Sequence, residues 1–352
     1  MSKPTGSKAA DIQTQRQDFY QTINPLHLAP LWESFAHLIT PEPRTPCVPH
    51  LWPYADVRPH VLASGELISA EEAERRVLVL ENPALRGSSC ITRSLYAGLQ
   101  LVLPHEVAPC HRHAQSALRL IVEGSGAYTA VDGEPVYMEP GDFIITSSWA
   151  WHDHGNETGE PVVWLDGLDI PMVQFFDASF VERYPEPSHP ATRPAGTSAA
   201  RFGRNMLPVN YGHRKGRFPL FSYPYARSRE ALDLMAAESP PDPWQGVKME
   251  FVNPLDGGPA MATISSFIQH LPAGMETKPL RSTDGTVFHV IEGSGESTIN
   301  GQTFTWGPKD TFVVPSWHAH RMQAGADAVL FSFSDRGVQQ KLNLWREEKL
   351  EA

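Results

Sequence analysis

The sequence is short of cysteine, of basic residues and of long apolar runs, and each shortage excludes a class of protein. Its 352 residues include 3 cysteines, too few and too scattered for a disulfide framework. Asp and Glu number 40 against 29 Lys and Arg, and the net charge of -11 argues against nucleic acid or an anionic membrane as a partner. No segment approaches the roughly 18 consecutive apolar residues that cross a bilayer.

The same shortages indicate where the protein works. Its cysteines, Cys47, Cys90 and Cys110, are odd in number, so we expect reduced thiols. Residues 1–17 are polar and lack the apolar core of a secretory signal. We therefore expect a cytoplasmic location.

Proline and glycine, in contrast, are plentiful. The 32 prolines and 26 glycines would interrupt helices, and they suit an all-β protein with many turns. Hydrophobic residues make up 41% of the chain, which is enough for a sizeable core. Because 352 residues exceed a typical single domain, two similar units and an extension are expected.

Helices are predicted in the N-terminal part of the chain. Residues 1–24 are predicted to be a polar, poorly ordered start that merges into a helix. Apolar residues then recur at helical spacing: Leu28, Leu31, Trp32, Phe35, Leu38 and Ile39. A further helix is predicted over Ser69–Leu80, with Ser69 as N-cap and Glu72 as its capping-box partner. The proline-rich remainder of this region, up to residue 90, is predicted to be loop.

From Leu99 onward the apolar period changes to two, which is typical of strands. Turn signals at Asp132-Gly133 and at 140–142 separate the strands. We expect them to form a small β-barrel or jelly roll. The predicted strands are Leu99–Leu103, Ala117–Val122, Tyr128–Val131, Phe143–Thr146 and Val162–Leu168.

A later section of the chain repeats this one. The string IVEGSG at 121–126 returns as VIEGSG at 290–295, and PGDFIITSSW at 140–149 matches PKDTFVVPSW at 308–317. A single deletion aligns both matches, so we predict two barrels of one kind. The predicted domains are an N-terminal extension at 1–90, barrels at 91–182 and 246–345, and a packed irregular connector at 183–245.

Histidines carry the chemistry that the pattern indicates. Three His-x-His pairs occur where chance gives about 0.6: His111/His113, His152/His154 and His318/His320. On a strand, the two rings of such a pair lie on one face and can converge on one ion. We expect His111 and His113 to precede the first strand of the first barrel, and a jelly roll would bring the strand of His152 beside them. These three imidazoles form the predicted metal site.

Around these histidines the sequence resembles the bicupin gentisate 1,2-dioxygenases, a group that also cleaves salicylate and 1-hydroxy-2-naphthoate. The likeness extends over most of the chain. The segments that carry it are PCHRHAQSALRLIVEG at 109–124, PGD at 140–142, WHDHG at 151–155, WLDGLDIP at 164–171, QFFD at 174–177 and ERRVLVLENP at 74–83.

The resemblance implies an all-β bicupin fold, with two jelly-roll barrels in one chain and an N-terminal helical extension. It implies one Fe(II) per chain at His111, His113 and His152. The expected reaction is extradiol-type cleavage of gentisate by dioxygen, between the carbons that bear the carboxyl and hydroxyl groups, giving maleylpyruvate. Members are commonly homotetramers, and the helical extension would be the assembly element.

One departure from the general cupin pattern bears on the metal. Many cupins have a glutamate ligand four residues after the second histidine, where this chain has Ala117. Three neutral imidazoles leave the ion its full charge and an open side, which suits Fe(II) that binds a chelating anion and dioxygen. Imidazoles alone would also take Ni, Cu or Zn, so the choice of iron rests on the resemblance.

The second barrel departs further from a metal site. The repeat alignment places Leu280 and Ser282 where the first barrel has His111 and His113, and only His320 matches a ligand, His152. A single imidazole does not hold iron, so we expect the second barrel to be metal-free and to serve packing or assembly.

Beside the metal, Arg119, His154 and Asp166 are the catalytic candidates. Arg119 has the inward parity of position 117 and could bind a substrate carboxylate with two parallel hydrogen bonds, although an ion pair with Asp166 is the alternative. His154 shares the parity of His152, and a structural role is its alternative. In the resembling family, the positions of Gln100, Arg119, His154 and Asp166 line the substrate pocket; for Gln100 and Asp166, a satisfied core hydrogen bond competes with this role.

Two further residues are substrate-binding candidates. Arg75 matches an arginine that reaches the pocket in the resembling family, whereas a helical arginine is more often solvated. Gly98 could leave room that a larger residue would fill, and so influence the choice of substrate.

Other functions stay open from the sequence. The nearest is the same cleavage of salicylate, a substituted salicylate or 1-hydroxy-2-naphthoate. A non-catalytic bicupin binding protein is the next, and a three-histidine metal site beside an inward arginine argues against it. A Zn or Mn cupin isomerase would usually keep the glutamate ligand that Ala117 replaces.

Overall fold

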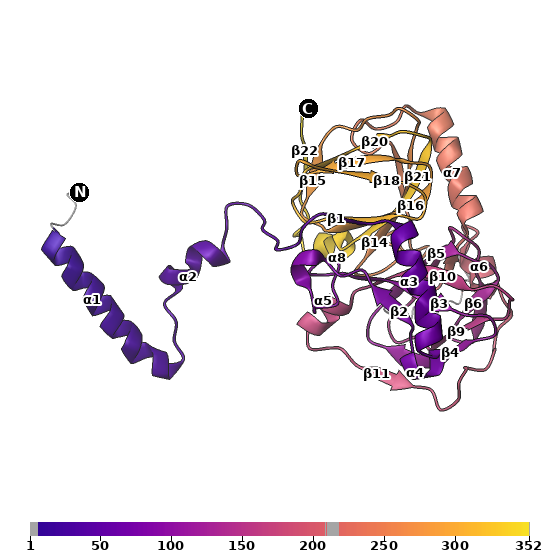
Figure 1. Ribbon diagram of the computed structural model, residues 1–352, viewed down its shortest axis with the longest axis horizontal. Helices are drawn as coiled ribbons and strands as arrows, with labels where there is room; N and C mark the ends of the chain where they lie inside the picture. Colours follow the sequence, from indigo (N-terminus) through magenta and orange to yellow (C-terminus); the bar gives the residue numbers. More distant parts are fainter. Residues whose placement is uncertain (1–5, 208, 210–217, 352) are drawn as a thin grey trace. The chain divides into compact units, whose positions relative to one another are not determined.

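The computed structural model describes residues 6–207, 209 and 218–351. Contacts between residues divide the chain into two units, residues 1–44 and residues 45–352. Figure 1 labels most of the elements of both units. The helices are α1 (Gly6–Ile23), α2 (Leu31–Leu38), α3 (Tyr54–Leu67), α4 (Ala70–Ala73), α5 (Ile170–Phe175), α6 (Thr197–Phe202), α7 (Tyr225–Glu238) and α8 (Arg336–Lys341), with short 3-10 helices at Asn24–Leu26 and Pro83–Leu85.

The first unit is a pair of helices, α1 and α2. The poorly ordered start predicted for residues 1–24 is wrong for Gly6–Ile23, which form α1. The Trp32 indole donates to the hydroxyl of Tyr20 at 2.8 Å, and that hydroxyl donates to Glu33, which ties α2 to α1. The predicted apolar helix begins only at Leu31, because Pro30 stands at its N-cap. Its apolar side chains stay exposed within the chain; Trp32 is 63% exposed and Leu38 67%.

The second unit contains two β-barrels, each made of a six-stranded and a five-stranded sheet. In the first barrel the six-stranded sheet has the order β12 (Ser222–Tyr223), β8 (Phe143–Thr146), β5 (Ala117–Glu123), β10 (Val162–Leu168), β3 (Tyr96–Val102), β2 (Val77–Val79). Its five-stranded sheet has the order β11 (Val181–Arg183), β4 (Val107–His113), β9 (His152–Asn156), β6 (Ala127–Val131), β7 (Glu134–Tyr137).

The second barrel has the same arrangement. Its six-stranded sheet has the order β1 (His50–Trp52), β19 (Thr311–Val314), β16 (Thr286–Glu292), β21 (Ala328–Ser334), β14 (Ser265–Leu271), β13 (Val247–Glu250). Its five-stranded sheet has the order β18 (Gln302–Trp306), β17 (Gly295–Ile299), β20 (His320–Ala324), β15 (Leu280–Ser282), β22 (Glu347–Lys349). The predicted all-β bicupin architecture with N-terminal helices is confirmed.

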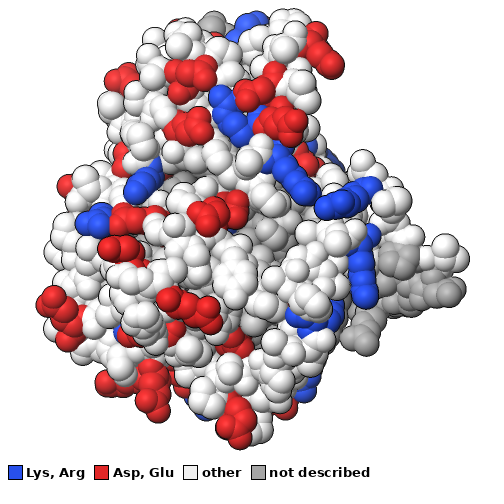
Figure 2. All heavy atoms as spheres, turned by 90° about the vertical axis from the view of Figure 1, so that its right-hand side faces the viewer, with Lys and Arg blue, Asp and Glu red and all other residues white. Residues whose placement is uncertain are grey.

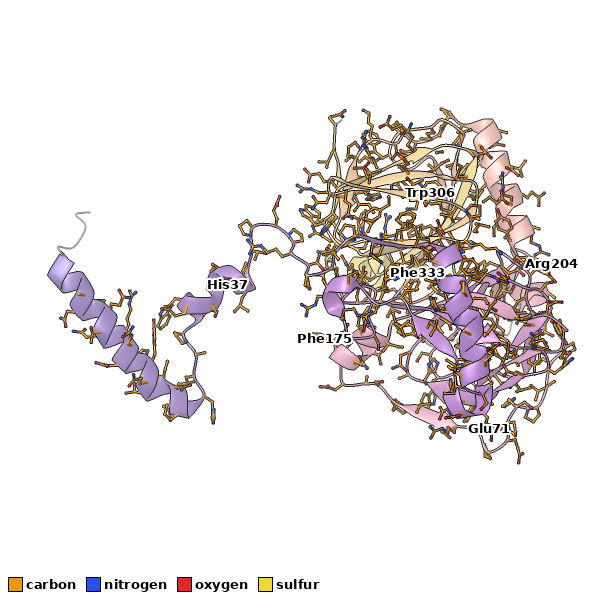
Figure 3. All side chains as sticks on the ribbon, in the orientation of Figure 1. His37, Glu71, Phe175, Arg204, Trp306 and Phe333 are labelled. Atoms are coloured by element: carbon orange, nitrogen blue, oxygen red, sulfur yellow. The ribbon has the colours of Figure 1, made fainter. Side chains whose placement is uncertain are left out.

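Hydrophobic packing joins the barrels and fills them. Because side chains alternate along a strand, each six-stranded sheet presents one apolar face to the other barrel and one to its own interior. Leu99, Leu118 and Phe333 belong to the core that both barrels share. Trp164 and Trp306 lie in the interiors of the first and second barrel. Figure 3 shows Trp306 among the strands of the second barrel and Phe333 where the two barrels meet.

The repeat extends beyond the barrels themselves. The segment that precedes each barrel adds an edge strand to the other barrel. β1, before the first barrel, pairs with β19 of the second, and β12, before the second barrel, pairs with β8 of the first. The backbone N–H of Tyr54, at the start of α3, donates to Asp310 of the second barrel. Symmetrically, the N–H of Tyr225, at the start of α7, donates to Asp142 of the first barrel. These crossed contacts bind the barrels into one body.

Two predictions about local structure in the region before residue 90 are wrong. The helix predicted over Ser69–Leu80 stops at Ala73: Ser69 caps it as predicted, but Glu74 has a φ of 55°, and the β-branched Val77 and Val79 pair with β3. The segment predicted as loop contains β1 and α3. Pro53 stands at the N-cap of α3, where no N–H is needed, and the helix continues through Pro59 although that residue cannot donate to the helical ladder. The domain boundaries at 90, 182 and 245 stay predictions.

The surface agrees with the acidic composition. On the face shown in Figure 2, acidic side chains are spread over both barrels, with basic ones interspersed. Among the described residues, no helix combines the length and the apolar character needed to cross a bilayer.

Candidate metal and substrate site

Three histidines of the first barrel meet on neighbouring strands. His111 and His113 lie on β4 itself, and not before the first strand as predicted, and His152 opens β9. The two strands pair with His111 opposite His152, so the expected convergence occurs. One nitrogen from each ring lies within 4.8 Å of the others, and this group could hold a metal ion.

Hydrogen bonds to the backbone orient two of these rings. The Nδ1 atom of His113 lies 2.9 Å from the carbonyl of Gln115, and the Nδ1 atom of His152 lies 3.0 Å from that of Ala150. Each contact requires a proton on Nδ1 and leaves Nε2 as a free lone pair. The Nε2 atom of His152 is fully buried and has no hydrogen-bond partner. An orphaned acceptor beside two further imidazoles fits a divalent metal.

Burial keeps the three rings in the form that binds metal. It lowers the pKa of His111 to about 2, helped by the positive charge of Arg75. Burial likewise lowers the pKa of His113 to about 4 and that of His152 well below its usual value. All three rings are therefore neutral at physiological pH, as ligation requires.

Arg119 lies on β5 in the same barrel and is 3% exposed. Its Nη1 donates to the Thr146 hydroxyl at 2.7 Å, its Nη2 lies 3.1 Å from Nε2 of His154, and its Nε lies 3.4 Å from a carboxylate oxygen of Asp166. Arg119 and Asp166 stand opposite each other on β5 and β10. The ion pair weighed as the alternative thus exists. The hydrogen bonds engage two of the five N–H donors of the guanidinium, while Nε is buried with Asp166 at ion-pair distance but has no hydrogen-bond partner.

His154 and Asp166 complete a buried polar chain. His154 is fully buried, and its Nδ1 lies 2.9 Å from the hydroxyl of Thr129. The indole of Trp164 donates to Asp166 at 3.1 Å. Burial raises the pKa of Asp166 to about 6, and Arg119 opposes that rise. The geometry therefore fixes the Arg119 guanidinium from several sides.

Arg75 reaches the histidines from outside the barrel sheets. It lies between α4 and β2, and not on a helix as predicted. Its Nη1 donates to the carbonyl of Pro109 at 3.0 Å, and its Nη2 lies 3.2 Å from Nε2 of His111. Burial, with the nearby charge of Arg119, lowers the pKa of Arg75 to about 10, so it stays cationic. It adds a second positive charge beside the predicted metal position.

Gly98 and Gln100 lie on β3, next to β10. Gly98 stands opposite Asp166, and Gln100, which is 2% exposed, stands opposite Trp164. The space beside Gly98 is already occupied: a Cβ there would lie 2.4 Å from Cγ1 of Val77 and 3.1 Å from the hydroxyl of Tyr96. The room expected at Gly98 is therefore filled by its neighbours.

The second barrel keeps the strand register without the ligands. Leu280 pairs with His320 on β15 and β20, as His111 pairs with His152 on β4 and β9. This register confirms the repeat alignment. Among the described residues, the histidine group of the first barrel is the one set of three His, Cys, Asp or Glu side chains close enough to share an ion.

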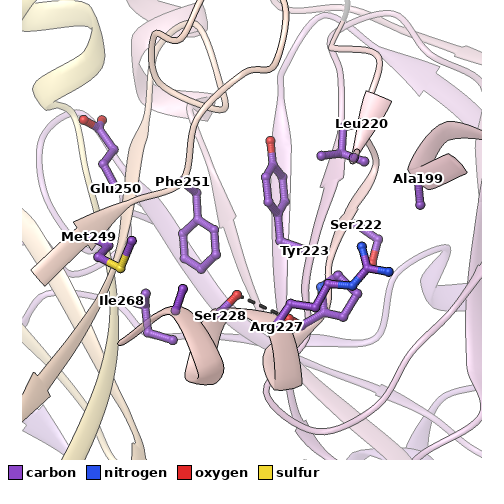
Figure 4. Close-up of a pocket in the computed structure, with 13 residues that line it drawn as sticks. Ala199, Leu220, Ser222, Tyr223, Arg227, Ser228, Met249, Glu250, Phe251 and Ile268 are labelled. Atoms are coloured by element: carbon purple, nitrogen blue, oxygen red, sulfur yellow. Dashed lines mark hydrogen bonds between the residues drawn. The ribbon is translucent and has the colours of Figure 1, made fainter. Parts of the chain in front are cut away.

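A separate pocket of about 230 Å³ opens between α6, α7 and β13. Figure 4 shows Tyr223, Phe251, Met249 and Ile268 facing one another there. None of the clustered histidines and none of Arg75, Arg119 and Asp166 lines it. This pocket is therefore distinct from the predicted reaction site.

Comparison with known proteins decides the family. The cupin domain family matches residues 98–168 and 267–333, one match in each barrel. Gentisate 1,2 dioxygenase 1 of Aquipseudomonas alcaligenes is 54% identical over 338 residues, which are 96% of this chain and 97% of that protein. The chain belongs to the gentisate 1,2-dioxygenase family. Membership in this family makes it a ring-cleaving dioxygenase.

Other members of the family differ in the substrate that they are named for. The 5-aminosalicylate 1,2-dioxygenase of Comamonas sp is 35% identical over 96% of this chain and 91% of its own length. The crystal structure of salicylate 1,2-dioxygenase from Pseudaminobacter salicylatoxidans superposes with a TM-score of 0.88, at 33% identity and 99% coverage of both chains. Fold and family are thus shared across several hydroxybenzoate substrates.

Two residues of the site, Thr146 and Thr129, were not predicted from the sequence. Thr146 and Thr129 hold Arg119 and His154 through their hydroxyls. Both fall within predicted strands, where a polar residue among apolar neighbours was the available signal. Their partners lie on other strands, so only the folded barrel reveals the contacts.

Proposed function

We propose that this chain is an Fe(II)-dependent dioxygenase that cleaves gentisate between its carboxyl- and hydroxyl-bearing carbons and forms maleylpyruvate. The observation that carries the proposal is the juxtaposition of three neutral imidazoles and a buried arginine inside one barrel. The 54% identity to a gentisate 1,2 dioxygenase over nearly the whole chain favours gentisate.

The proposed metal site consists of His111, His113 and His152 and holds one Fe(II) per chain. The Nε2 atoms of His113 and His152 are free, that of His152 being buried without a partner, and Nε2 of His111 faces Arg75 at 3.2 Å; this set of imidazole nitrogens fits such an ion. Bound Fe(II) would supply coordination for the substrate oxygens and electron transfer to dioxygen. The second barrel, with Leu280 at the place of His111, would hold none.

The protein groups orient the substrate in this proposal. Arg119 offers its remaining N–H donors to the substrate carboxylate, while Thr146, His154 and Asp166 keep the guanidinium from rotating. Arg75 adds positive charge for a dianionic chelate. Gln100 and Gly98 form part of the wall on β3.

Oxygen uptake by the anaerobically Fe(II)-loaded protein tests the proposal, with gentisate and salicylate offered separately. We expect stoichiometric uptake with gentisate and release of maleylpyruvate. Uptake with salicylate alone would overturn the assignment of substrate, and no uptake with either, at one bound iron per chain, would overturn the proposed reaction. Metal analysis after loading with Fe(II), Mn(II) or Zn(II) tests the choice of iron.

Salicylate or a substituted salicylate is the second candidate substrate. It is supported by the superposition on salicylate 1,2-dioxygenase, which has also been solved as an adduct with gentisate. The filled space at Gly98 is a local feature that would limit bulky ring substituents. Relative kcat/KM values for the two acids decide between the candidates.

We further propose a cytoplasmic homotetramer in which residues 1–44 are the assembly element. The exposed apolar side chains of α2 support this role, and the three unpaired cysteines support a reducing compartment. Removal of residues 1–44 should lower the mass measured by light scattering. An unchanged tetramer would contradict the role of this segment.

A further inference from the structure

The interior of the second barrel contains a row of side chains that replaces the catalytic row of the first. In the first barrel, Gly98, Asp166 and Arg119 stand side by side across β3, β10 and β5. The same row in the second barrel is Phe267, Ser332 and Phe288, across β14, β21 and β16. Cross-strand partners share a face of the sheet, so Ser332 lies between two phenyl rings.

An unpaired ammonium lies over this row. The Nζ atom of Lys248, on β13, is 4.6 Å from the ring centre of Phe267 and 5.8 Å from that of Phe288. It forms no hydrogen bond and no ion pair with the described residues, and burial lowers its pKa to about 8. Asp284, whose charge opposes that shift most, instead accepts a hydrogen bond from the Trp345 indole.

A second cation approaches the same ring. The guanidinium of Arg336, at the start of α8, lies 5.7 Å from Phe267 and 3.9 Å from the ring of Trp345. Its Nε is fully buried without a hydrogen-bond partner, and it forms no ion pair with the described residues. Two cations therefore flank one aromatic surface, and neither forms an ion pair with a carboxylate of the described residues.

Buried polar atoms around the cations are also without partners. Ser332 is 0% exposed, and its Oγ forms no hydrogen bond. The same holds for Oε1 of Gln269, which is 3% exposed and stands two residues beyond Phe267 on β14. Unsatisfied buried groups are rare in folded proteins, and a cluster of them indicates a ligand or ordered water.

We propose that the interior of the second barrel is a binding site for a small aromatic carboxylate, formed by Lys248, Arg336, Ser332, Phe267 and Phe288. The two cations would neutralise the carboxylate, and the Ser332 hydroxyl would donate to it. The phenyl and indole rings would pack against an aromatic body. With Leu280 and Ser282 at the ligand positions, the site binds without ring cleavage, so it senses an aromatic acid independently of the substrate of the first barrel.

Equilibrium dialysis of radiolabelled benzoate against the anaerobic Fe(II)-loaded enzyme tests the site, because benzoate lacks the hydroxyl needed for chelation. We expect Arg119→Met protein, in which the first barrel is impaired, still to bind benzoate. Adding Lys248→Met should weaken the affinity for benzoate by about 10- to 100-fold, which is the loss expected for a hydrogen bond to a charged group. Arg336→Gln should weaken the same binding.

Lys278→Met is the matched control. Lys278 also lies over an aromatic ring, that of Trp244 at 5.0 Å, but it is paired with Glu351 on the surface, so its loss should leave benzoate binding unchanged. Iron content and a thermal melt establish that each variant is folded. The proposal is overturned if Arg119→Met protein binds no benzoate, or if it binds benzoate equally with and without Lys248→Met.

Discussion

The two barrels have the same backbone arrangement, including non-glycine residues with a positive φ at matching positions. Trp149 and Trp317 both have a φ of 61°, and their N–H groups donate to the carbonyls of His113 and Ser282. Arg112 on β4 stacks on Trp149, and Arg281 on β15 stacks on Trp317, at 4.6 Å in both barrels. Because the second barrel keeps this arrangement without a histidine triad, the arrangement does not depend on a metal.

The interiors of the barrels differ in what their strands carry. The first barrel places Arg119, Thr146 and His154 where the second has Phe288, Val314 and Met322. Phe288 and Phe312 stack at 5.0 Å in the second barrel, as expected for an ordinary hydrophobic core. In the first barrel, burial lowers the pKa of Arg119 and raises that of Asp166 to about 6, which is the signature of charges held against their solvation preference. The first barrel therefore holds an ion pair and a histidine triad in its interior, whereas the second holds stacked aromatic rings beside an unpaired lysine.

The largest effect is expected when one histidine is removed from the first barrel and compared with removal of one histidine from the second. His111→Ala should abolish metal binding and activity. Loss of a group that only orients a ligand already costs about 10- to 100-fold in metal affinity, so loss of the ligand itself should exceed that range. His320→Ala, at the place of His152 in the second barrel, should keep both metal content and activity. An iron-replete, active His111→Ala enzyme would disprove the assigned site.

The next test concerns the buried cation of the first barrel. Arg119→Met should keep the iron but raise the KM for an aromatic acid by about 100-fold, since removing one member of a buried charge pair costs about 2–5 kcal/mol. Arg281→Met is the control, because Arg281 pairs with Glu348 near the surface of the second barrel. An unchanged KM in Arg119→Met would leave Arg119 with a role in packing alone.

The internal repeat is the part of the fold that the sequence reveals most directly. Similar strings such as PGDFIITSSW and PKDTFVVPSW fix the register of whole barrels, and the structure pairs Leu280 with His320 as that register requires. The exchange of β1 and β12 between barrels was not predicted. In the sequence this exchange corresponds to the string PYA, which occurs at 53–55 and again at 224–226. The string is too short to indicate a repeat without the contacts of Tyr54 and Tyr225.

The site was predictable where strand parity decides and not where side chains reach across strands. Inward parity brought Arg119 and Asp166 together, but it gave no information about which donors of the guanidinium are engaged. The helix predicted to extend to Leu80 failed because tertiary pairing of Val77 with β3 overrides local helical spacing. Sequence therefore locates the reacting groups, and packing determines how firmly they are held.

Replacing Thr146 of the first barrel by the corresponding residue of the second barrel tests whether the hydrogen bond to Arg119 contributes to substrate binding. Thr146→Val installs the residue of the second barrel and removes the hydroxyl that accepts from Arg119 at 2.7 Å. A hydrogen bond to a charged group is worth about 1.5–3 kcal/mol, so we expect the KM to rise by about tenfold with unchanged iron content. Thr146→Ser, which keeps the hydroxyl, should restore the KM. Equal KM values for Val and Ser variants would show that Thr146 does not position Arg119.

The smallest effect is on stability, and it concerns the unpaired lysine of the second barrel. The pKa of Lys248 falls from 10.5 to about 8 on folding, so between these pH values the unfolded chain binds more protons and the stability of the wild type rises with pH. The cost of the buried charge is present in full below pH 8 and is gone above pH 10.5. After allowance for partial exposure, Lys248→Met should stabilise the protein at pH 7 by about 1 kcal/mol in urea unfolding, with the difference disappearing near pH 10.5.

Saturating benzoate should narrow the difference at pH 7, because the ligand stabilises only the protein that retains the ammonium. A Lys248→Met protein that is less stable at pH 7 would mean that the ammonium contributes to the core of the second barrel as a structural group.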